Sequence, residues 1–298
     1  MANTDLHPRG VYCAAMTPLT EDYAPDHAAF VAHAKGLLDQ GSDGIALLGT
    51  TGEANSFSTA QRKALLEAAV EGGIAPARLM PGTGVPALME TVDLTRHAVA
   101  LGVPAVVMLP PFYYKTASDE GLFAAYSEVI ERVGDDRLKV VLYHIPHISG
   151  VAISHGLIER LRARYPDTVT GIKDSAGDFA NMEAIIARFP GFAVLTGADP
   201  LMLPLLKIGG AGCITATSNL VAADLATVYR GYDDPAQAEA VEAAQARVTA
   251  ARERVVGPAQ MATIKALLAQ ATGNAGWNRL CPPLLPLSAD ERARLLDA

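Results

Sequence analysis

The sequence contains few cysteines and no cluster of metal-binding residues. Its three cysteines, Cys13, Cys213 and Cys281, are an odd number at wide spacing, which provides neither a disulfide framework nor a metal-binding knuckle. No group of His, Asp or Glu residues has the spacing of metal ligands. We therefore expect no metal, no cofactor and a reducing, cytoplasmic location.

Long apolar runs are also absent. Charge or proline interrupts every apolar stretch before it reaches the roughly 20 residues that span a bilayer, so we expect no membrane partner. The first ten residues, MANTDLHPRG, contain no basic region followed by an apolar one, which predicts no secretory signal. The net charge of −8 argues against a nucleic-acid partner. Because half of the residues are apolar, the chain can bury the core of an enzyme-sized soluble protein.

Short apolar runs alternate with amphipathic stretches along most of the chain. The runs that we expect to be strands lie at 11–16, 44–49, 79–84, 105–110, 139–145, 169–174, 192–197 and 212–216. Between them, apolar residues recur at about i, i+3, i+4 and i+7, as at 26–40, 59–71, 87–100, 119–133 and 181–188, which predicts helices packed on a sheet. Strands that are apolar nearly throughout are covered on both faces, as in a parallel sheet.

Eight such strand–helix units predict an α/β protein with a (β/α)8 TIM barrel over residues 1–232. The alternative is a doubly wound open sheet, which often has a glycine-rich phosphate turn after its first strand. The first predicted strand is instead followed by Pro18, Leu19 and Thr20, which favours the barrel. After Tyr232 only helical patterns remain, with start signals at Asp234-Pro235, Gly257-Pro258 and Ser288-Ala289-Asp290-Glu291. We expect these to form a three-helix C-terminal extension over residues 233–298.

Lys173 lies inside a predicted apolar strand with the sequence VTGIK, where alternation directs its side chain into the barrel. The catalytic residues of TIM barrels lie at the C-terminal ends of the strands, where Lys173 is also placed. Burying an ammonium group costs free energy, and a neutral amine in an apolar pocket is the nucleophile that forms an imine with a ketone. The alternative is a structural lysine paired with a carboxylate such as Asp174.

Polar residues also follow the neighbouring strand ends. Tyr143 lies at the matching depth on the adjacent strand, where its hydroxyl can transfer protons, although a tyrosine there can equally be a core residue. The 49–53 turn, GTTGE, offers two hydroxyls and free backbone N–H groups that suit a carboxylate; otherwise it is simply a tight turn. His144 and His147 leave the same strand as Tyr143 and can contact substrate or serve as hydrogen-bonded loop residues.

The segments GTTGE at 49–53, LYHIP at 142–146 and GIKDSAGD at 171–178 resemble the dihydrodipicolinate synthase / N-acetylneuraminate lyase family. The resemblance runs over nearly the whole chain and includes GTG at 82–84, EGLFAAY at 120–126 and the helical tail. Each motif alone is weak, but their combination and order are specific. The family consists of (β/α)8 lyases and aldolases that act on pyruvate or other 2-oxo acids through a Schiff base.

The resemblance implies a role for each matching residue. Lys173 would form the imine and Tyr143 would relay protons. Thr50 would link Tyr143 to Tyr114, which in the family reaches in from a neighbouring subunit. The chain is therefore expected to be a homo-oligomer, at least a dimer and commonly a tetramer.

The resemblance also implies how pyruvate is held. Thr51 and Gly52, with the backbone of the same turn, would bind its carboxylate. The carbonyl group of Ile214 would face the relay tyrosine.

Three departures from the family narrow the second substrate. Ile148 stands where the synthase has an arginine for the carboxylate of aspartate semialdehyde, and it cannot pair with an anion. Asp199-Pro200 stands where sialic acid lyases have Asp-Glu. The positions of the lysine-feedback site read Thr59, Arg62 and Pro86. We therefore expect a sugar-derived or other 2-oxo acid, bound through His144, His147, Ser175, Asp199 or Ser218.

Several functions remain open at this point. The first is a Schiff-base lyase or aldolase that makes or cleaves a C–C bond next to pyruvate. The others are a 2-keto-3-deoxy sugar acid dehydratase that uses the same imine, the 4-hydroxy-tetrahydrodipicolinate synthase of lysine biosynthesis, and a non-catalytic protein that binds 2-oxo acids. An imine-forming lysine argues against the last, since a pure binding protein does not need one.

Overall fold

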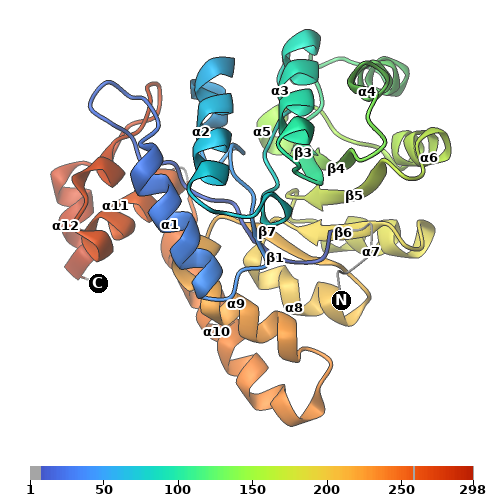
Figure 1. The fold of residues 1–298 in the computed structure, drawn as a ribbon. Helices are drawn as coiled ribbons and strands as arrows, with labels where there is room; N and C mark the ends of the chain where they lie inside the picture. Colours follow the sequence, from blue (N-terminus) through green and yellow to red (C-terminus); the bar gives the residue numbers. More distant parts are fainter. Residues whose placement is uncertain (1–7, 258, 298) are drawn as a thin grey trace.

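The sheet at the centre of the protein is parallel and strongly curled. A computed structural model describes residues 8–257 and 259–297, so Pro258 and the first seven residues of MANTDLHPRG lie outside it. Seven strands have the order β2-β1-β7-β6-β5-β4-β3 (Figure 1). They are β1 Gly10–Cys13, β2 Gly44–Ile45, β3 Ala105–Met108, β4 Lys139–His144, β5 Val169–Asp174, β6 Ala193–Thr196 and β7 Gly212–Thr215. The predicted α/β class and parallel sheet are confirmed.

The expected strand at 79–84 is not a regular strand. One parallel bridge joins Leu79 to Ile45 of β2 and another joins Gly82 to Val107 of β3, so the segment bonds to both outer strands of the sheet. Pro81 has no N–H group to donate to a ladder. A Cβ on Gly82 would lie 2.2 Å from the carbonyl oxygen of Leu48, so the backbones approach here more closely than side chains permit. The prediction of eight regular strands is therefore wrong at this segment.

Helices cover the outer face of the sheet. Their bounds are α1 His27–Asp39, α2 Thr59–Glu71, α3 Leu88–Ala100, α4 Asp119–Val133, α5 Pro146–Ser149, α6 His155–Arg164, α7 Phe179–Arg188, α8 Met202–Lys207 and α9 Ser218–Gly231. Local capping explains several starts: Ser58 and Gln61 form a capping box before α2, and the Ser118 side chain accepts from the Gly121 N–H at the start of α4. The eight expected strand–helix units implied helices after the other strands, and the structure supplies the bounds of α6, α8 and α9, which no predicted range covered.

The buried apolar residues form an inner and an outer layer. Val140 and Leu142 of β4 belong to the cluster that faces the helices, whereas Val141 and Tyr143 belong to a smaller cluster enclosed by the sheet. This alternation is the two-residue period of a strand. On β5, Ile172 packs outward, so its neighbour Lys173 faces the enclosed side.

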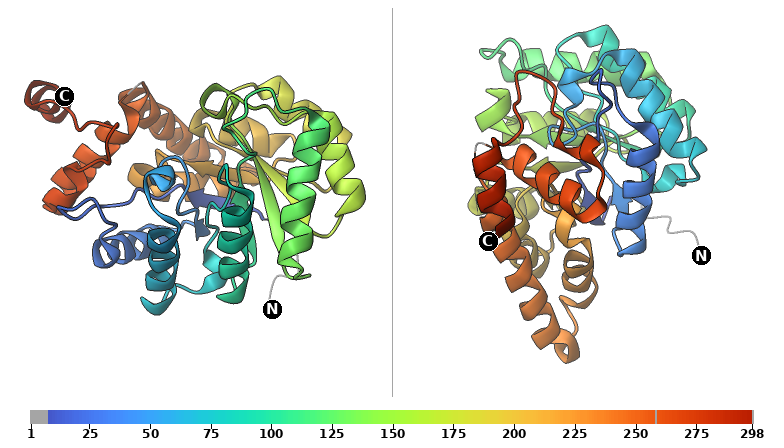
Figure 2. Two further views of the ribbon diagram at one scale, coloured as in Figure 1. Left: turned by 90° about the horizontal axis from the view of Figure 1, so that it is seen from above. Right: turned by 90° about the vertical axis from the view of Figure 1, so that its left-hand side faces the viewer.

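Helices α10 Ala238–Val255, α11 Gln260–Thr272 and α12 Ala289–Asp297 follow the sheet. Both views in Figure 2 show these C-terminal helices to one side, next to the N-terminal part of the chain. A buried ion pair connects α11 to the 49–53 turn. Lys265 of α11 bonds to Glu53 of that turn, and both side chains are fully buried. No helix within residues 8–257 and 259–297 combines the length and apolar character needed to span a membrane.

Candidate functional site

Lys173 is buried near the C-terminal end of β5 with 5% of its surface exposed. Among the described residues, no carboxylate oxygen lies within 4.0 Å of the Lys173 amine, because the lysines that form ion pairs are Lys63 and Lys265. Asp174, the expected structural partner, faces the other side of the strand and accepts from the Asn181 side chain at 2.7 Å. The structural alternative for Lys173 thus loses its proposed partner.

Tyr143 of β4 lies directly beside Lys173 in the strand register. The Nζ of Lys173 is 4.1 Å from the centre of the Tyr143 ring. Burial alone would raise the pKa of Tyr143, but the positive charge of Lys173 and polar contacts with Thr50, Lys173 and Ser175 outweigh it, so the pKa lies below its ordinary value. The phenol is therefore better able to release a proton than an isolated tyrosine.

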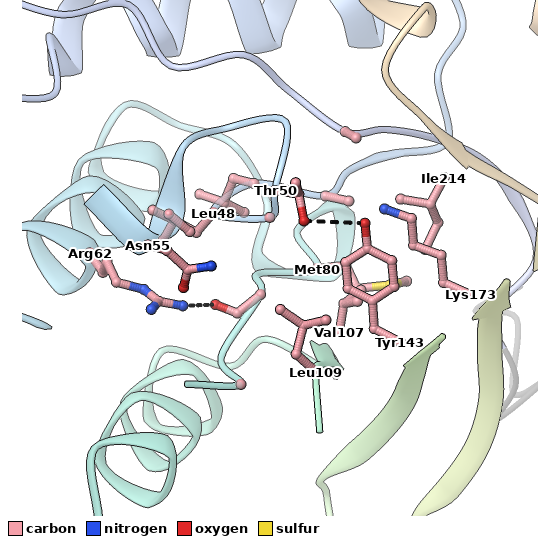
Figure 3. A pocket seen from close by; sticks show the side chains of 17 residues that line it. Leu48, Thr50, Asn55, Arg62, Met80, Val107, Leu109, Tyr143, Lys173 and Ile214 are labelled. Carbon is pink, nitrogen blue, oxygen red and sulfur yellow. Dashed lines mark hydrogen bonds between the residues drawn. The ribbon is translucent and has the colours of Figure 1, made fainter. Parts of the chain in front are cut away.

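The 49–53 turn brings a hydroxyl group to the same place. The Oγ1 of Thr50 is 3.4 Å from the phenol oxygen of Tyr143, and Figure 3 shows these side chains facing each other with Lys173 and Ile214 close by. Gly52 lies deeper, where a Cβ would be 2.9 Å from the Ala15 carbonyl. The turn thus needs a glycine at that position to pack against the segment that follows β1.

Two cavities meet at this cluster. Thr50, Tyr143, Lys173 and Ile214 line both a small inner pocket, which has room for about one water molecule, and a larger outer cavity of about 450 Å³. The larger volume is within the usual range for small-molecule sites. The remaining residues of the outer cavity are Thr51, Ile145, His147, Ile148, Ser175, Gly197, Ala216, Arg252, Val256, Gly257, Gln260 and Met261.

Seven of the predicted site residues meet in the outer cavity. They are Lys173, Tyr143, Thr50, Thr51, Ile214, His147 and Ser175. Gly52, His144, Asp199, Ser218 and Tyr114 do not line it. Their roles in binding or catalysis stay predictions.

His144 faces the helices and serves the backbone. Its Nδ1 accepts a hydrogen bond from the Ile153 N–H at 3.0 Å. Burial lowers its pKa, and Asp174 and Asp178 oppose this shift. The neutral imidazole therefore fastens the loop that follows β4.

Asp199 and Ser218 lie behind the cavity wall. Asp199 is completely buried, and neither carboxylate oxygen has a hydrogen-bond partner of good geometry among the described residues. Burial raises its pKa, and contacts with Thr215 and Thr217 oppose the shift. The Ser218 hydroxyl donates to the Thr215 carbonyl.

Tyr114 and the expected feedback positions lie elsewhere. Tyr114 is 72% exposed and packs edge-on against the ring of Tyr113. Thr59, Arg62 and Pro86 line a separate cavity of about 550 Å³ that does not include Lys173, although Arg62 also lines the small inner pocket that Lys173 borders. Arg62 is buried and donates to the Gly82 carbonyl at 2.9 Å (Figure 3), and burial lowers its pKa to about 10.

The C-terminal helices contribute two polar residues that sequence analysis missed. Arg252 of α10 and Gln260 of α11 line the outer cavity. Nothing in the sequence distinguishes Arg252 from Arg247 or Arg254 of the same helix, because only the folded chain places one of them over the sheet.

The arrangement is suited to carbonyl chemistry. The buried amine of Lys173, which has no ion-pair partner among the described residues, faces the phenol of Tyr143, whose pKa is lowered, and the hydroxyl of Thr50 lies beside that phenol. These three residues line a cavity large enough for an organic acid. In the described part of the chain no group of three or more His, Cys, Asp or Glu residues could hold a metal ion.

Comparison with known proteins gives matches over nearly the full length. The model of the Dihydrodipicolinate synthetase family matches residues 7–298. An uncharacterized DapA-like lyase of Chloroflexus aurantiacus is 36% identical over 291 residues, 97% of this chain and 95% of that protein. The 4-hydroxy-tetrahydrodipicolinate synthase of Bacillus subtilis is 32% identical over 87% of each chain. The crystal structure of dihydrodipicolinate synthase from Agrobacterium tumefaciens superposes with a TM-score of 0.83, at 29% identity over 96% of each chain.

Proposed function

The chain belongs to the dihydrodipicolinate synthetase family and is a lyase, and on that premise we propose that it makes or cleaves a C–C bond next to pyruvate through a Schiff base on Lys173. The substrate in this proposal is a sugar-derived or other 2-oxo acid. No metal or cofactor is required, because the imine itself withdraws the electrons.

The unpaired amine of Lys173 carries the proposal. The other two buried lysines have partners away from the outer cavity: Lys265 pairs with Glu53, and Lys139 donates to the Asp136 carbonyl. Lys173 instead faces the ring of Tyr143 at 4.1 Å and opens into the outer cavity. A buried amine that has no anionic partner and opens into a cavity of substrate size is placed to act as a nucleophile.

In the proposed reaction the neutral amine attacks the keto carbon, and the tetrahedral carbinolamine loses water to give the imine. Tyr143 returns a proton to the departing hydroxyl group and is recharged through Thr50. The protonated imine then accepts the electron pair of the C3–C4 bond while the relay of Tyr143 and Thr50 takes up the proton of the C4 hydroxyl group, so an aldehyde leaves and an enamine remains. Protonation of C3 and hydrolysis release pyruvate, and condensation is the reverse.

Further residues complete this proposal. Thr51, Gly52 and the backbone N–H groups of the 49–53 turn would hold the carboxylate next to the keto group, and the Ile214 carbonyl would face Tyr143. His147 and Ser175 line the cavity and would contact the hydroxyl groups of a sugar-derived substrate.

The proposed architecture is a closed (β/α)8 barrel over residues 1–232, with residues 233–298 as an extension. Bridges from Leu79 and Gly82 to the two outer strands favour closure of the sheet through this segment. The exposed ring of Tyr114 favours an assembly in which it enters the site of a second copy, in a dimer or tetramer. Tyr114→Ala would then lower activity and shift the oligomeric state measured by light scattering.

The decisive experiment is borohydride trapping with pyruvate, read by mass spectrometry. We expect one added 1-carboxyethyl group, the product of reducing the pyruvate imine, on a peptide that contains Lys173, and none in Lys173→Met. Lys139→Met is the matched control, because Lys139 is also largely buried and lies on the neighbouring strand β4; it should still be trapped. A wild-type protein that stays unmodified would refute the proposal.

A second candidate is 4-hydroxy-tetrahydrodipicolinate synthase, favoured by the relative of that name in Bacillus subtilis. It requires aspartate semialdehyde as the acceptor, and Ile148 of α5 gives no cation for the carboxylate of that acceptor. Consumption of pyruvate only when aspartate semialdehyde is added would select this candidate. Water loss from 2-keto-3-deoxy acids without pyruvate release would indicate a dehydratase.

A further inference from the structure

Outside the sheet, the outer cavity has one more fixed positive charge. Arg252 belongs to α10 and lines the same cavity as Lys173 and Ser175. No Asp or Glu is among the residues that line this cavity. A cavity with cationic side chains and no carboxylate favours anionic ligands.

The guanidinium of Arg252 has no ion-pair partner within the described residues, unlike its neighbours on the helix. Arg247 pairs with Asp224 at 2.6 Å, and Arg254 donates to the Leu295 carbonyl at 2.8 Å. The positive charge of Arg252 is felt by Asp199, whose pKa it lowers against the larger effect of burial. Asp199 is fully buried behind the cavity and forms no ion pair with it, so the guanidinium remains available to a ligand.

Gln260 supplies a second donor in the same wall. Its Nε2 is buried and has no hydrogen-bond partner among the described residues. A buried amide donor without an acceptor is uncommon in folded proteins. Because Gln260 lines the cavity, a rotation of its side chain would bring this amide to a ligand oxygen as its acceptor.

Two apolar residues that line the cavity cannot hold an anion in this way. Ile148 of α5 is apolar and 58% exposed. Val256, one turn after Arg252, is also apolar and exposed. Lys173 is needed for the reaction at the keto carbon. Of the other residues that line the outer cavity, only Arg252 is positively charged at every physiological pH.

We propose that Arg252, with Gln260, holds a carboxylate or phosphate at the end of the substrate remote from the keto group. The substrates are then 2-oxo acids with a second acidic group, and the C-terminal extension selects them. This inference rests on imine formation at Lys173. The planar fork of a guanidinium bonds such groups through two parallel hydrogen bonds.

The test compares 2-oxo acids that differ only at the far end. One pair is 2-oxohexanoate and 2-oxoadipate, and the other is 2-keto-3-deoxygluconate and its 6-phosphate. The concentration that gives half-maximal borohydride trapping at Lys173 is measured for each, because trapping requires the imine but no turnover. The variant is Arg252→Met, and the matched control is Arg247→Met, which removes the same charge from the exposed side of α10.

We expect the acid-ended member of at least one pair to be trapped at a concentration about 10- to 100-fold lower, as a charged hydrogen bond allows. The preference should disappear in Arg252→Met, persist in Arg247→Met and be weakened in Arg252→Lys, which keeps the charge but loses the fork. Which pair responds distinguishes a carboxylate from a phosphate.

Two results would overturn the inference while leaving the proposed function intact. In one, wild type traps pyruvate but prefers the acid-ended member of neither pair. In the other, the preference survives in Arg252→Met. Failure of wild type to trap pyruvate at all would instead refute the proposed function. Trapping of pyruvate by a variant shows that its active site is folded. If Arg252→Met fails to trap pyruvate, the preference for the acid-ended substrate is measured in Arg252→Lys instead.

Discussion

Replacing Lys265 with methionine should remove a large part of the stability of the fold. Lys265 bonds to Glu53 and also to the Arg279 carbonyl, at 2.7 Å, while the second carboxylate oxygen of Glu53 accepts from the Cys281 N–H at 2.8 Å. Without the lysine, a fully buried carboxylate keeps one N–H group as its only partner. Removing one partner of a buried ion pair costs about 3–5 kcal/mol, which is a third or more of the stability of many domains.

The double variant Glu53→Gln with Lys265→Met separates charge from packing. It buries no charge, and the Gln carbonyl can still accept from the Cys281 N–H, so the main remaining loss is the unpaired Arg279 carbonyl. That loss is roughly 1–3 kcal/mol. The double variant should therefore be more stable than Lys265→Met by roughly 2 kcal/mol, although it carries one more substitution.

Urea unfolding provides the measurement. The single tryptophan of the chain, Trp277, is buried in the same C-terminal region, so its fluorescence reports on the extension and far-ultraviolet circular dichroism reports on the whole fold. Coincident transitions justify a two-state free energy. The reasoning fails if Lys265→Met unfolds within 1 kcal/mol of wild type, or if the double variant is less stable than the single one.

Three further outcomes follow from the geometry. Tyr143→Phe should lower kcat by about 10²- to 10⁴-fold while pyruvate trapping at Lys173 persists, and an unchanged kcat in a coupled assay would argue against a proton relay. Burial lowers the pKa of His144 below the value of about 6.5 in the unfolded chain. The neutral imidazole therefore contributes fully to the free energy of unfolding above a pH of about 6.5. This contribution falls by up to about 1.4 kcal/mol per pH unit as the pH drops toward the folded pKa. Urea unfolding of wild type and His144→Asn from pH 7.5 to 5 should show a flatter dependence in the variant. Gly82→Ala would press a Cβ on the Leu48 carbonyl and should cost about 1–3 kcal/mol; unchanged thermal unfolding would contradict this.

Elements with a local cause were predictable from the sequence. The bounds of α2, α4 and β5 match the predicted 59–71, 119–133 and 169–174, because capping serines or an uninterrupted apolar run define them. The predicted strand at 44–49 ends early instead, at Ile45. Leu48 has a φ of 57°, a left-handed conformation that nothing in the apolar sequence signals.

The site was predictable where strand alternation decides it. Successive side chains of a strand point to opposite faces of the sheet. Lys173 and Tyr143 therefore face the enclosed side, because the preceding residues Ile172 and Leu142 pack outward against the helices. The same kind of pattern surrounds Lys265, in the apolar run TIKALL, yet that lysine is a structural one. Sequence alone cannot separate the two, because the partner of Lys265 lies 212 residues away.

That separation has a consequence for synthesis on the ribosome. At about 5–20 residues per second, the 212 residues between Glu53 and Lys265 take roughly 10–40 seconds to appear. During that interval the carboxylate of the 49–53 turn has no counter-charge and costs free energy to bury. The nascent N-terminal half is therefore expected to keep this turn hydrated until the last helices arrive. The nascent chain would then bind substrate only after the ribosome has synthesised α11.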